Sequence, residues 1–303
     1  MFPKKNSRLE AEMKELWKAR QALVERALEA ELAKTDVLDA TLRASMAYSL
    51  MAGGKRLRPV LLMAAADAVG ADGTKFLPVA SALEMIHTYS LIHDDLPAMD
   101  NDDLRRGKPT NHVVYGEGIA ILAGDALLTL AFSVILRQRD VPAEALLRVV
   151  DEISRAAGAE GMVGGQVLDL AAENHRISME ELRRVHMGKT GALFRAALRS
   201  GAILADATEE QLAALTAYAE HFGLAFQITD DILDVIGTAE DIGKPVGSDE
   251  KNHKSTYVSL TSLQEAQELA RRTAEEAEQA LSMFTAEADF LRELVVYLVN
   301  RKQ

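Results

Sequence analysis

Two aspartate-rich segments contain the residues best suited to chemistry in this sequence. Residues 94–103 read DDLPAMDNDD, and residues 230–234 read DDILD. Each segment follows an apolar stretch with helical periodicity, so its acids lie at a helix C-terminus, where they oppose the helix dipole. A solvated helix end explains this poorly, and a bound cation explains it better. Each Asp pair is also followed, at the same spacing, by Gly-Lys-Pro at 107–109 and 243–245, which suggests two equivalent halves that face one another.

The spacing of these acids predicts a site for hard divalent cations. On a helix, Asp230 and Asp234 lie about 40° apart, so their carboxylates share one face. Pro97 cannot continue the helix that contains Asp94, and we expect the chain to loop and bring Asp100 back toward Asp94. Oxygen ligands in a sequence without cysteine suit Mg²⁺ or Mn²⁺ better than zinc. We therefore expect the two segments to hold a cluster of Mg²⁺ ions on a diphosphate.

Basic residues near the acids predict an anionic substrate. The segment GGKRLRP at 53–59 places Lys55 and Arg58 at an expected helix start, and Arg105 and Arg106 follow the first acidic segment. Arginine is suited to bidentate recognition of phosphate. In a chain of net charge −12, such bases beside acids indicate a substrate held by metal ions on one side and by Lys and Arg on the other.

The elements that must position these residues are helices. Nearly every stretch has helical periodicity, and residues 178–181 and 208–211 are capping-box patterns. No alternating β-branched run long enough for a sheet occurs, and no linker divides the sequence. We therefore predict an all-α fold, a single helical domain over residues 1–303 with about ten or more helices. The expected helices cover residues 8–33, 35–50, 58–70, 75–96, 117–138, 142–158, 178–205, 208–236, 262–281 and 285–300.

Composition limits the possible classes of function. The 303 residues include 34 Lys and Arg against 46 Asp and Glu, which argues against a nucleic-acid binder, and 48% apolar residues can form a large core. The apolar segment from Gly118 to Leu136 resembles a membrane span. Because Asp125 lies near its middle, we interpret it as a buried core helix and expect no membrane span. The N-terminus has no apolar signal-peptide region, so we expect a cytoplasmic protein.

The motifs together resemble those of one enzyme family. DDLPAMD (94–100), DDLRRGKPT (102–110), GGKRLRP (53–59), GKT (188–190) and DDILD (230–234) with GKP (243–245) are similar to the motifs of short-chain trans-isoprenyl diphosphate synthases. Within that family the sequence is nearest to the bacterial type that makes the C15 product, farnesyl diphosphate. The resemblance implies an isoprenoid synthase fold with helices around a deep central cavity, usually in a homodimer. It also implies Mg²⁺-dependent head-to-tail condensation of isopentenyl diphosphate with dimethylallyl or geranyl diphosphate.

The resemblance further implies roles for individual residues. It implies that isopentenyl diphosphate is bound by Lys55, Arg58, His87 and Arg106. It implies that the allylic diphosphate is bound by Arg105, Lys189, Lys244 and Lys254. It implies that Mg²⁺ is ligated directly by Asp94, Asp100 and Asp230, with support from Asp95, Asp231 and Asp234. The implied catalytic residues are Lys189, Thr190 and Gln227, of which the last two would face the developing carbocation.

Product length and the choice between related functions depend on few residues. Tyr89 lies five residues before Asp94, about 7.5 Å along a helix that the growing chain must follow, and Ser90 beside it is small. In the resembling family an aromatic residue here forms the cavity floor, so we predict the C15 product, although Tyr89 could also be an ordinary core aromatic. A C20 geranylgeranyl synthase is the alternative. A terpene cyclase is disfavoured by Lys55 and Arg58, since cyclases lack an isopentenyl site, and a non-catalytic synthase subunit is disfavoured by the intact motifs.

Overall fold

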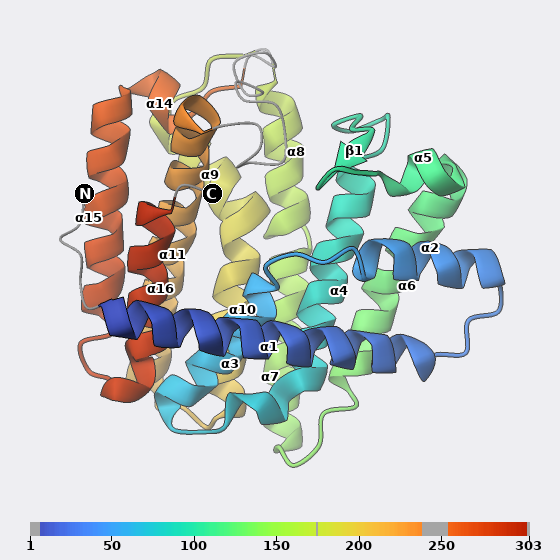
Figure 1. The fold of residues 1–303 in the computed structure, drawn as a ribbon, viewed down its shortest axis with the longest axis horizontal. Coiled ribbons are helices and arrows are strands. Elements are labelled where there is room, and N and C mark those ends of the chain that lie inside the picture. Colours follow the sequence, from blue (N-terminus) through green and yellow to red (C-terminus); the bar gives the residue numbers. More distant parts are fainter. Residues whose placement is uncertain (1–6, 174, 238–253, 302–303) are drawn as a thin grey trace.

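Long helices account for most of the described chain, as expected for a sequence rich in alanine and leucine. The computed structural model describes residues 7–173, 175–237 and 254–301. Its longer helices (Figure 1) are α1 (Ser7–Ala33), α2 (Ala40–Leu50), α3 (Leu57–Val69), α4 (Leu77–Asp94), α6 (Glu117–Ile135), α7 (Ala143–Ala157), α8 (Met162–Ala172), α9 (Met179–His186), α10 (Ala192–Leu204), α11 (Glu209–Ile236), α15 (Leu263–Ala280) and α16 (Asp289–Asn300). Short helical segments are η1 (Gly73–Phe76), α5 (Asn111–Tyr115), the π-helical turn η2 (Met187–Gly191), α14 (Tyr257–Leu260) and η3 (Ala286–Ala288).

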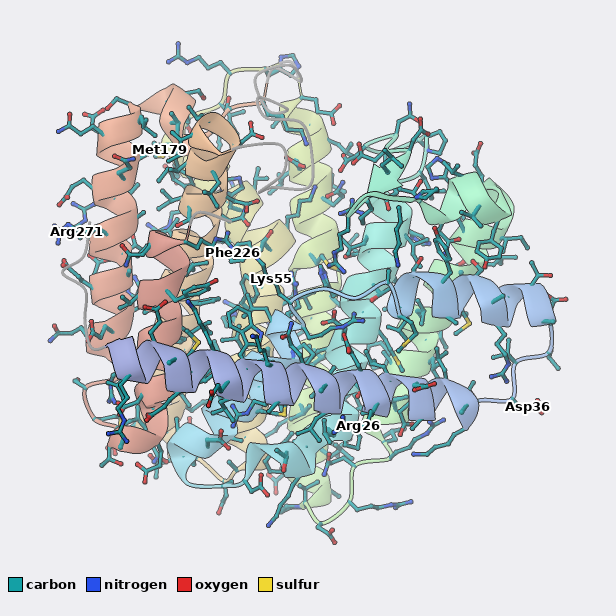
Figure 2. The ribbon with its side chains drawn as sticks, viewed as in Figure 1. Arg26, Asp36, Lys55, Met179, Phe226 and Arg271 are labelled. Atoms are coloured by element: carbon teal, nitrogen blue, oxygen red, sulfur yellow. The ribbon has the colours of Figure 1, made fainter. Side chains whose placement is uncertain are left out.

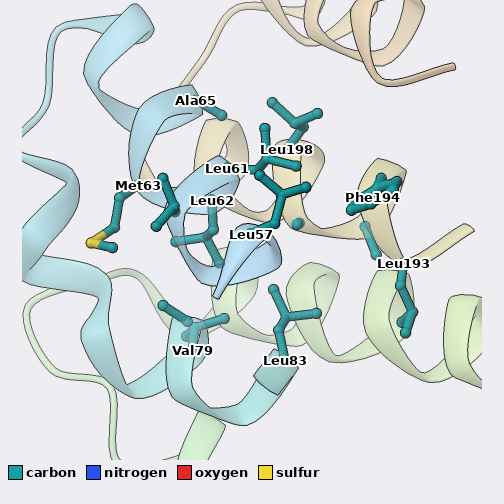
Figure 3. Close-up of a cluster of buried hydrophobic side chains, with 14 of the residues drawn as sticks. Leu57, Leu61, Leu62, Met63, Ala65, Val79, Leu83, Leu193, Phe194 and Leu198 are labelled. Carbon is teal, nitrogen blue, oxygen red and sulfur yellow. The ribbon is translucent and has the colours of Figure 1, made fainter. Parts of the chain in front are cut away.

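The helices pack around α10, which contacts α3, α7 and α11. Aliphatic side chains from α3, α4 and α10 interlock in the core, among them Leu61, Leu83 and Leu198 (Figure 3). Gly201 of α10 lies against the backbone of α3, where a Cβ would overlap the carbonyl oxygen of Leu62. Helix α4 packs most extensively on α6, and α11 on α15. In Figure 1, α4 and α11 both run toward the upper end of the bundle, so the acidic segments at their C-terminal parts share that end.

Most of the predicted helices are present, and the differences have physical causes. The predicted helix over 178–205 is interrupted by the π-helical turn η2. Helix α8 was not predicted, because Gly164 and Gly165 near its start lower its intrinsic helix propensity. The predicted helix over 35–50 begins only at Ala40, where the Asp39 carboxylate caps the first turn.

A short hairpin also forms where no strand was expected. Strand β1 (Leu104–Arg105) pairs antiparallel with β2 (Lys108–Pro109). Both residues of the connecting turn have positive φ, 54° at Arg106 and 74° at Gly107, as in the type I′ turns that suit two-residue hairpins. With two residues in each strand, the hairpin is too short to give a periodic signal in the sequence. It fixes the direction in which the Arg106 side chain leaves the backbone.

Helix α6 is, among the described helices, the one long and apolar enough to cross a membrane by length and composition. It is instead a partly buried core helix that packs along α4 and against α2, as predicted for this segment. Asp125, near its middle, keeps an exposed carboxylate.

Candidate active site

The first acidic segment forms the predicted loop. After α4 ends at Asp94, the Asp100 amide donates a hydrogen bond back to the Asp94 carbonyl at 2.9 Å. The amides of Asn101 and Asp102 donate to Leu96 and Asp95, and Asn101 adopts a positive φ of 54°. The chain therefore turns at Pro97 and returns Asp100 to the end of α4. This part of the expectation is confirmed.

The two acids of the first pair have different surroundings. The buried Asp95 carboxylate accepts a bidentate interaction from Arg105, with N–O distances of 2.6 to 2.9 Å. Asp94 is half-buried and has no such partner in its own segment. Burial raises the pKa of Asp94 to about 6, although the Lys189 ammonium lowers it, and the Asp100 carboxylate adds to the increase. A carboxylate crowded in this way gains stability from a bound cation.

The two acids of the second pair, Asp230 and Asp231, also have different surroundings. Asp231 is buried in α11, and its carboxylate accepts a hydrogen bond from the Tyr257 amide at 2.7 Å, which anchors α14. The Asp230 carboxylate is half-exposed and lies 3.3 Å from the guanidinium of Arg301. Asp234, one turn further along α11, is buried. In each pair, therefore, the second acid is buried and holds a neighbouring element, and the first acid is the more exposed of the two.

The described residues do not form a closed metal site by themselves. Within residues 7–173, 175–237 and 254–301, no three acidic or histidine side chains come together closely enough to hold an ion. The Mg²⁺ cluster therefore stays a prediction. The Gly-Lys-Pro that follows the second acidic segment, with Lys244, lies outside the described residues.

Lys189 lies on η2 and is held by an acid that was not predicted. Its Nζ binds Oδ2 of Asp169 on α8 at 2.8 Å, and Nζ of Lys254 lies 3.5 Å from the same oxygen. Burial alone would raise the pKa of Asp169, but the two ammonium groups outweigh burial and hold it below its usual value. Asp169 thus joins a lysine of η2 to a lysine that precedes α14. A single aspartate within the apolar run VLDLAA gave little sign of this role.

Glycines on both sides allow the helices to approach η2 closely. A Cβ at Gly165 of α8 would lie 2.0 Å from the Lys189 backbone nitrogen. A Cβ at Gly223 of α11 would lie 3.3 Å from Cα of Gly191. The turn also carries Thr190, which is half-buried, as is Gln227 on the neighbouring α11. Single π-helical turns within helices are frequent at functional sites, and this one sets where Lys189 and Thr190 lie.

The loop before α3 brings Lys55 and Arg106 together. The Arg106 guanidinium donates a hydrogen bond to the Gly53 carbonyl and occupies the place where a Gly54 Cβ would lie. The Lys55 side chain reaches the surface, yet desolvation lowers the pKa of Lys55 to about 8, and the guanidinium of Arg301 also lowers it. Arg301 covers the Phe226 ring, labelled in Figure 2, with a guanidinium-to-centroid distance of 4.9 Å. Arg301 was not predicted as a site residue.

Arg58 and His87 form a second group of basic residues deeper in the bundle. The Arg58 guanidinium is buried over the Phe194 ring, 4.8 Å from its centroid. Burial lowers the pKa of Arg58 to about 10, so it stays charged at neutral pH. Burial also holds the pKa of His87 well below its ordinary value, and the nearby Arg58 adds to this effect, so His87 is neutral at pH 7. An incoming anion would relieve this excess of positive charge.

Electrostatic coupling shows that these groups share one region. Lys55 interacts with both Asp230 and Arg106, which connects the second acidic segment to the turn after the first. Asp94 interacts with Lys189, which connects the first acidic segment to η2. Of the residues proposed for product length, Tyr89 is buried on α4, and the Ser90 hydroxyl donates to the His87 carbonyl at 2.9 Å.

Comparison with known proteins gives consistent matches over most of the chain. The polyprenyl synthetase family model matches residues 39–294. The chain is 50% identical over 284 residues to a farnesyl diphosphate synthase of Bacillus subtilis, covering 93% of this chain and 96% of that one. It is 48% identical over 259 residues to a geranylgeranyl diphosphate synthase of Cyanophora paradoxa, covering 85% and 86%. The crystal structure of a geranyltransferase from Legionella pneumophila superposes with a TM-score of 0.86 at 35% identity, covering 97% of this chain and 98% of that one.

Proposed function

Since this chain belongs to the polyprenyl synthetase family, we propose that it is a farnesyl diphosphate synthase. It is a prenyltransferase with the predicted all-α isoprenoid synthase fold, and it joins isopentenyl diphosphate head to tail to dimethylallyl or geranyl diphosphate. One observation carries the proposal: the two acidic segments share one end of the bundle, and each is coupled to a different base, Asp94 to Lys189 and Asp230 to Lys55. This arrangement can bind two diphosphates at once.

The donor set fits Mg²⁺, with Mn²⁺ as a substitute, because the outward-facing groups are carboxylates and Asp94 has an unfavourable charge without a cation. Asp94, Asp100 and Asp230 would hold the ions. Bound metal would neutralise the allylic diphosphate so that its C–O bond can ionise. Asp95 and Asp231 contribute differently, since their contacts with Arg105 and the Tyr257 amide fix the two acidic segments in place. Asp234 supports the second segment from its buried position on α11.

The allylic diphosphate is assigned to the bases nearest the acids. Arg105 binds Asp95 and acts on Asp94, as Lys189 does, and Lys254 lies beside Lys189 on Asp169. Lys244 completes the assigned set from outside the described residues. Thr190 and Gln227 present dipoles from η2 and α11 toward the carbocation that forms as the diphosphate leaves.

Isopentenyl diphosphate is assigned to Lys55, Arg58, His87 and Arg106. The support is electrostatic: the pKa values of all four are lowered, which means that each gains from an adjacent anion. Its double bond attacks the allylic cation, and the released diphosphate takes the proton. No protein general base is needed for this sequence of steps.

Product sizing tests the proposal. The protein is incubated with Mg²⁺, isopentenyl diphosphate and either dimethylallyl or geranyl diphosphate, and the products are separated by chain length. We expect C15 as the main product, because the aromatic Tyr89 lies buried on α4, one turn before the acidic segment. A C20 product would favour the geranylgeranyl synthase alternative, which the relative in Cyanophora paradoxa makes reasonable. No condensation would refute the function.

We further propose that residues 1–303 form a single domain that acts as a cytoplasmic homodimer without nucleic-acid partners. The support for the dimer is an exposed apolar surface on α5 and α6, formed by Val113, Val114, Ile121 and Leu122. Sedimentation of the purified protein tests this assembly, and Leu122→Glu should produce monomers if the surface is the interface.

A further inference from the structure

We propose that His93 is a positioning residue for product length, because it anchors the Tyr89 ring to α6. Tyr89 and His93 lie one turn apart on α4, and His93 contacts α6. The inference rests on the proposed function, since it concerns the depth available to the growing prenyl chain.

The His93 ring contacts both Tyr89 and α6. The rings of Tyr89 and His93 meet edge to face, with centroids 5.5 Å apart and an interplanar angle of 89°. Nε2 of His93 donates a hydrogen bond to the Ile121 carbonyl of α6 at 3.0 Å. A carbonyl can only accept, so Nε2 carries a proton in this contact. The ring is therefore fixed at one edge by α6 and supports Tyr89 with the rest of its surface.

Gly124 makes this contact possible. A Cβ at position 124 would lie 2.5 Å from Cδ2 of His93 and closer still to Nε2, distances that real Cβ atoms essentially never show. Glycine is unfavourable within a helix, so its presence in the middle of α6 indicates a packing requirement. Gly118 on the same helix has no atom within 4 Å of its Cβ position, so a methyl group there touches nothing. The requirement at Gly124 is thus specific to the His93 ring.

The location of Tyr89 explains why this anchor would control product length. Burial raises the pKa of Tyr89, and the carboxylates of Asp94, at the end of α4, and Asp125, in the middle of α6, add to the increase, so both act on the phenol. The ring is buried, and its edge-to-face partner is His93. If the His93 ring is removed or displaced, Tyr89 can move into the vacated volume. With Tyr89 in its proposed role as the floor for the growing chain, this movement deepens the floor, and longer products follow.

The experiment compares product lengths of four variants with the wild type, using Mg²⁺, isopentenyl diphosphate and geranyl diphosphate. We expect His93→Ala and Gly124→Ala to raise the ratio of C20 to C15 product at least fivefold. Gly118→Ala is the matched control and should leave the ratio unchanged. Tyr89→Ala should raise the ratio most, and adding His93→Ala to Tyr89→Ala should give no further increase, because His93 acts through Tyr89.

Two results would overturn the inference. One is an unchanged C20 to C15 ratio in His93→Ala while Tyr89→Ala lengthens the product. The other is an equal increase from His93→Ala with and without Tyr89, which would mean that His93 acts independently. Thermal unfolding monitors folding of each variant, and His93→Ala decides the matter if Gly124→Ala does not fold. Failure of the proposed function looks different, since the wild type would then consume no isopentenyl diphosphate or would already make mainly C20.

Discussion

Gly165→Ala is expected to damage catalysis by displacing the backbone of Lys189, with every substrate-binding side chain still present. The new Cβ would lie 2.0 Å from the Lys189 nitrogen, whereas real Cβ atoms keep at least 3.0 Å from such neighbours. The neighbouring atoms are backbone, so η2 and α8 must separate by about 1 Å, a displacement that can cost roughly 100-fold in rate. A rate lower by about 100-fold corresponds to an activation free energy higher by about 2.7 kcal/mol. Overpacking should also destabilise the fold by about 1–3 kcal/mol.

Steady-state kinetics with each substrate varied in turn would measure this effect. Because η2 carries Lys189 and Thr190, we expect kcat to fall while the KM for isopentenyl diphosphate changes less than threefold. Gly118→Ala, whose Cβ meets no neighbour, serves as the control for adding a methyl group to a helix. Circular dichroism confirms that the variant is folded. Wild-type kcat in a folded Gly165→Ala protein would show that the position of η2 does not govern the reaction.

Four further outcomes are expected. Asp94→Ala or Asp230→Ala should reduce turnover by orders of magnitude with the fold intact, and full wild-type activity in excess EDTA would contradict the metal assignment. Arg58→Ala should raise the KM for isopentenyl diphosphate more than the KM for the allylic substrate. A larger increase in the KM for the allylic substrate would mean that Arg58 binds the allylic diphosphate instead. Tyr89→Ser should shift the product to C20 or longer, and continued termination at C15 would place the floor elsewhere. Because the pKa of Lys55 is lowered to about 8, kcat/KM for isopentenyl diphosphate should fall as the pH rises through 8 and the Lys55 ammonium is lost. In Lys55→Arg this decrease should move to higher pH. An unchanged pH profile of kcat/KM in Lys55→Arg would contradict the assignment.

Local features of the site could be predicted because their causes are local. Pro97 cannot continue a helix, so the return of Asp100 toward Asp94 follows from the sequence alone. The apolar periodicity before each acidic segment similarly predicts α4 and α11, because a helix must bury one face wherever it packs.

Features that depend on distant parts of the chain were not predictable. Asp169 meets Lys189 and Lys254 only after α8, η2 and the segment before α14 have packed together. Arg301 reaches Asp230 only because α16 packs against α11. Helix α8 was not predicted for the same reason. Its glycines lower the local helix propensity, and the close packing that they permit stabilises the helix only once α8 and η2 are in contact in the folded protein.

The glycine contacts have a consequence for how relatives of this chain are classified. The aspartate-rich segments are the most recognisable sign of activity in this sequence. In this fold, a single methyl group at position 165 or 124 would displace Lys189 or His93 while every aspartate stayed in place. A gene copy could therefore lose activity through Gly165→Ala, or change its product length through Gly124→Ala, while all its signature motifs stay intact. Searches for degenerate copies should weigh these glycines alongside the carboxylates.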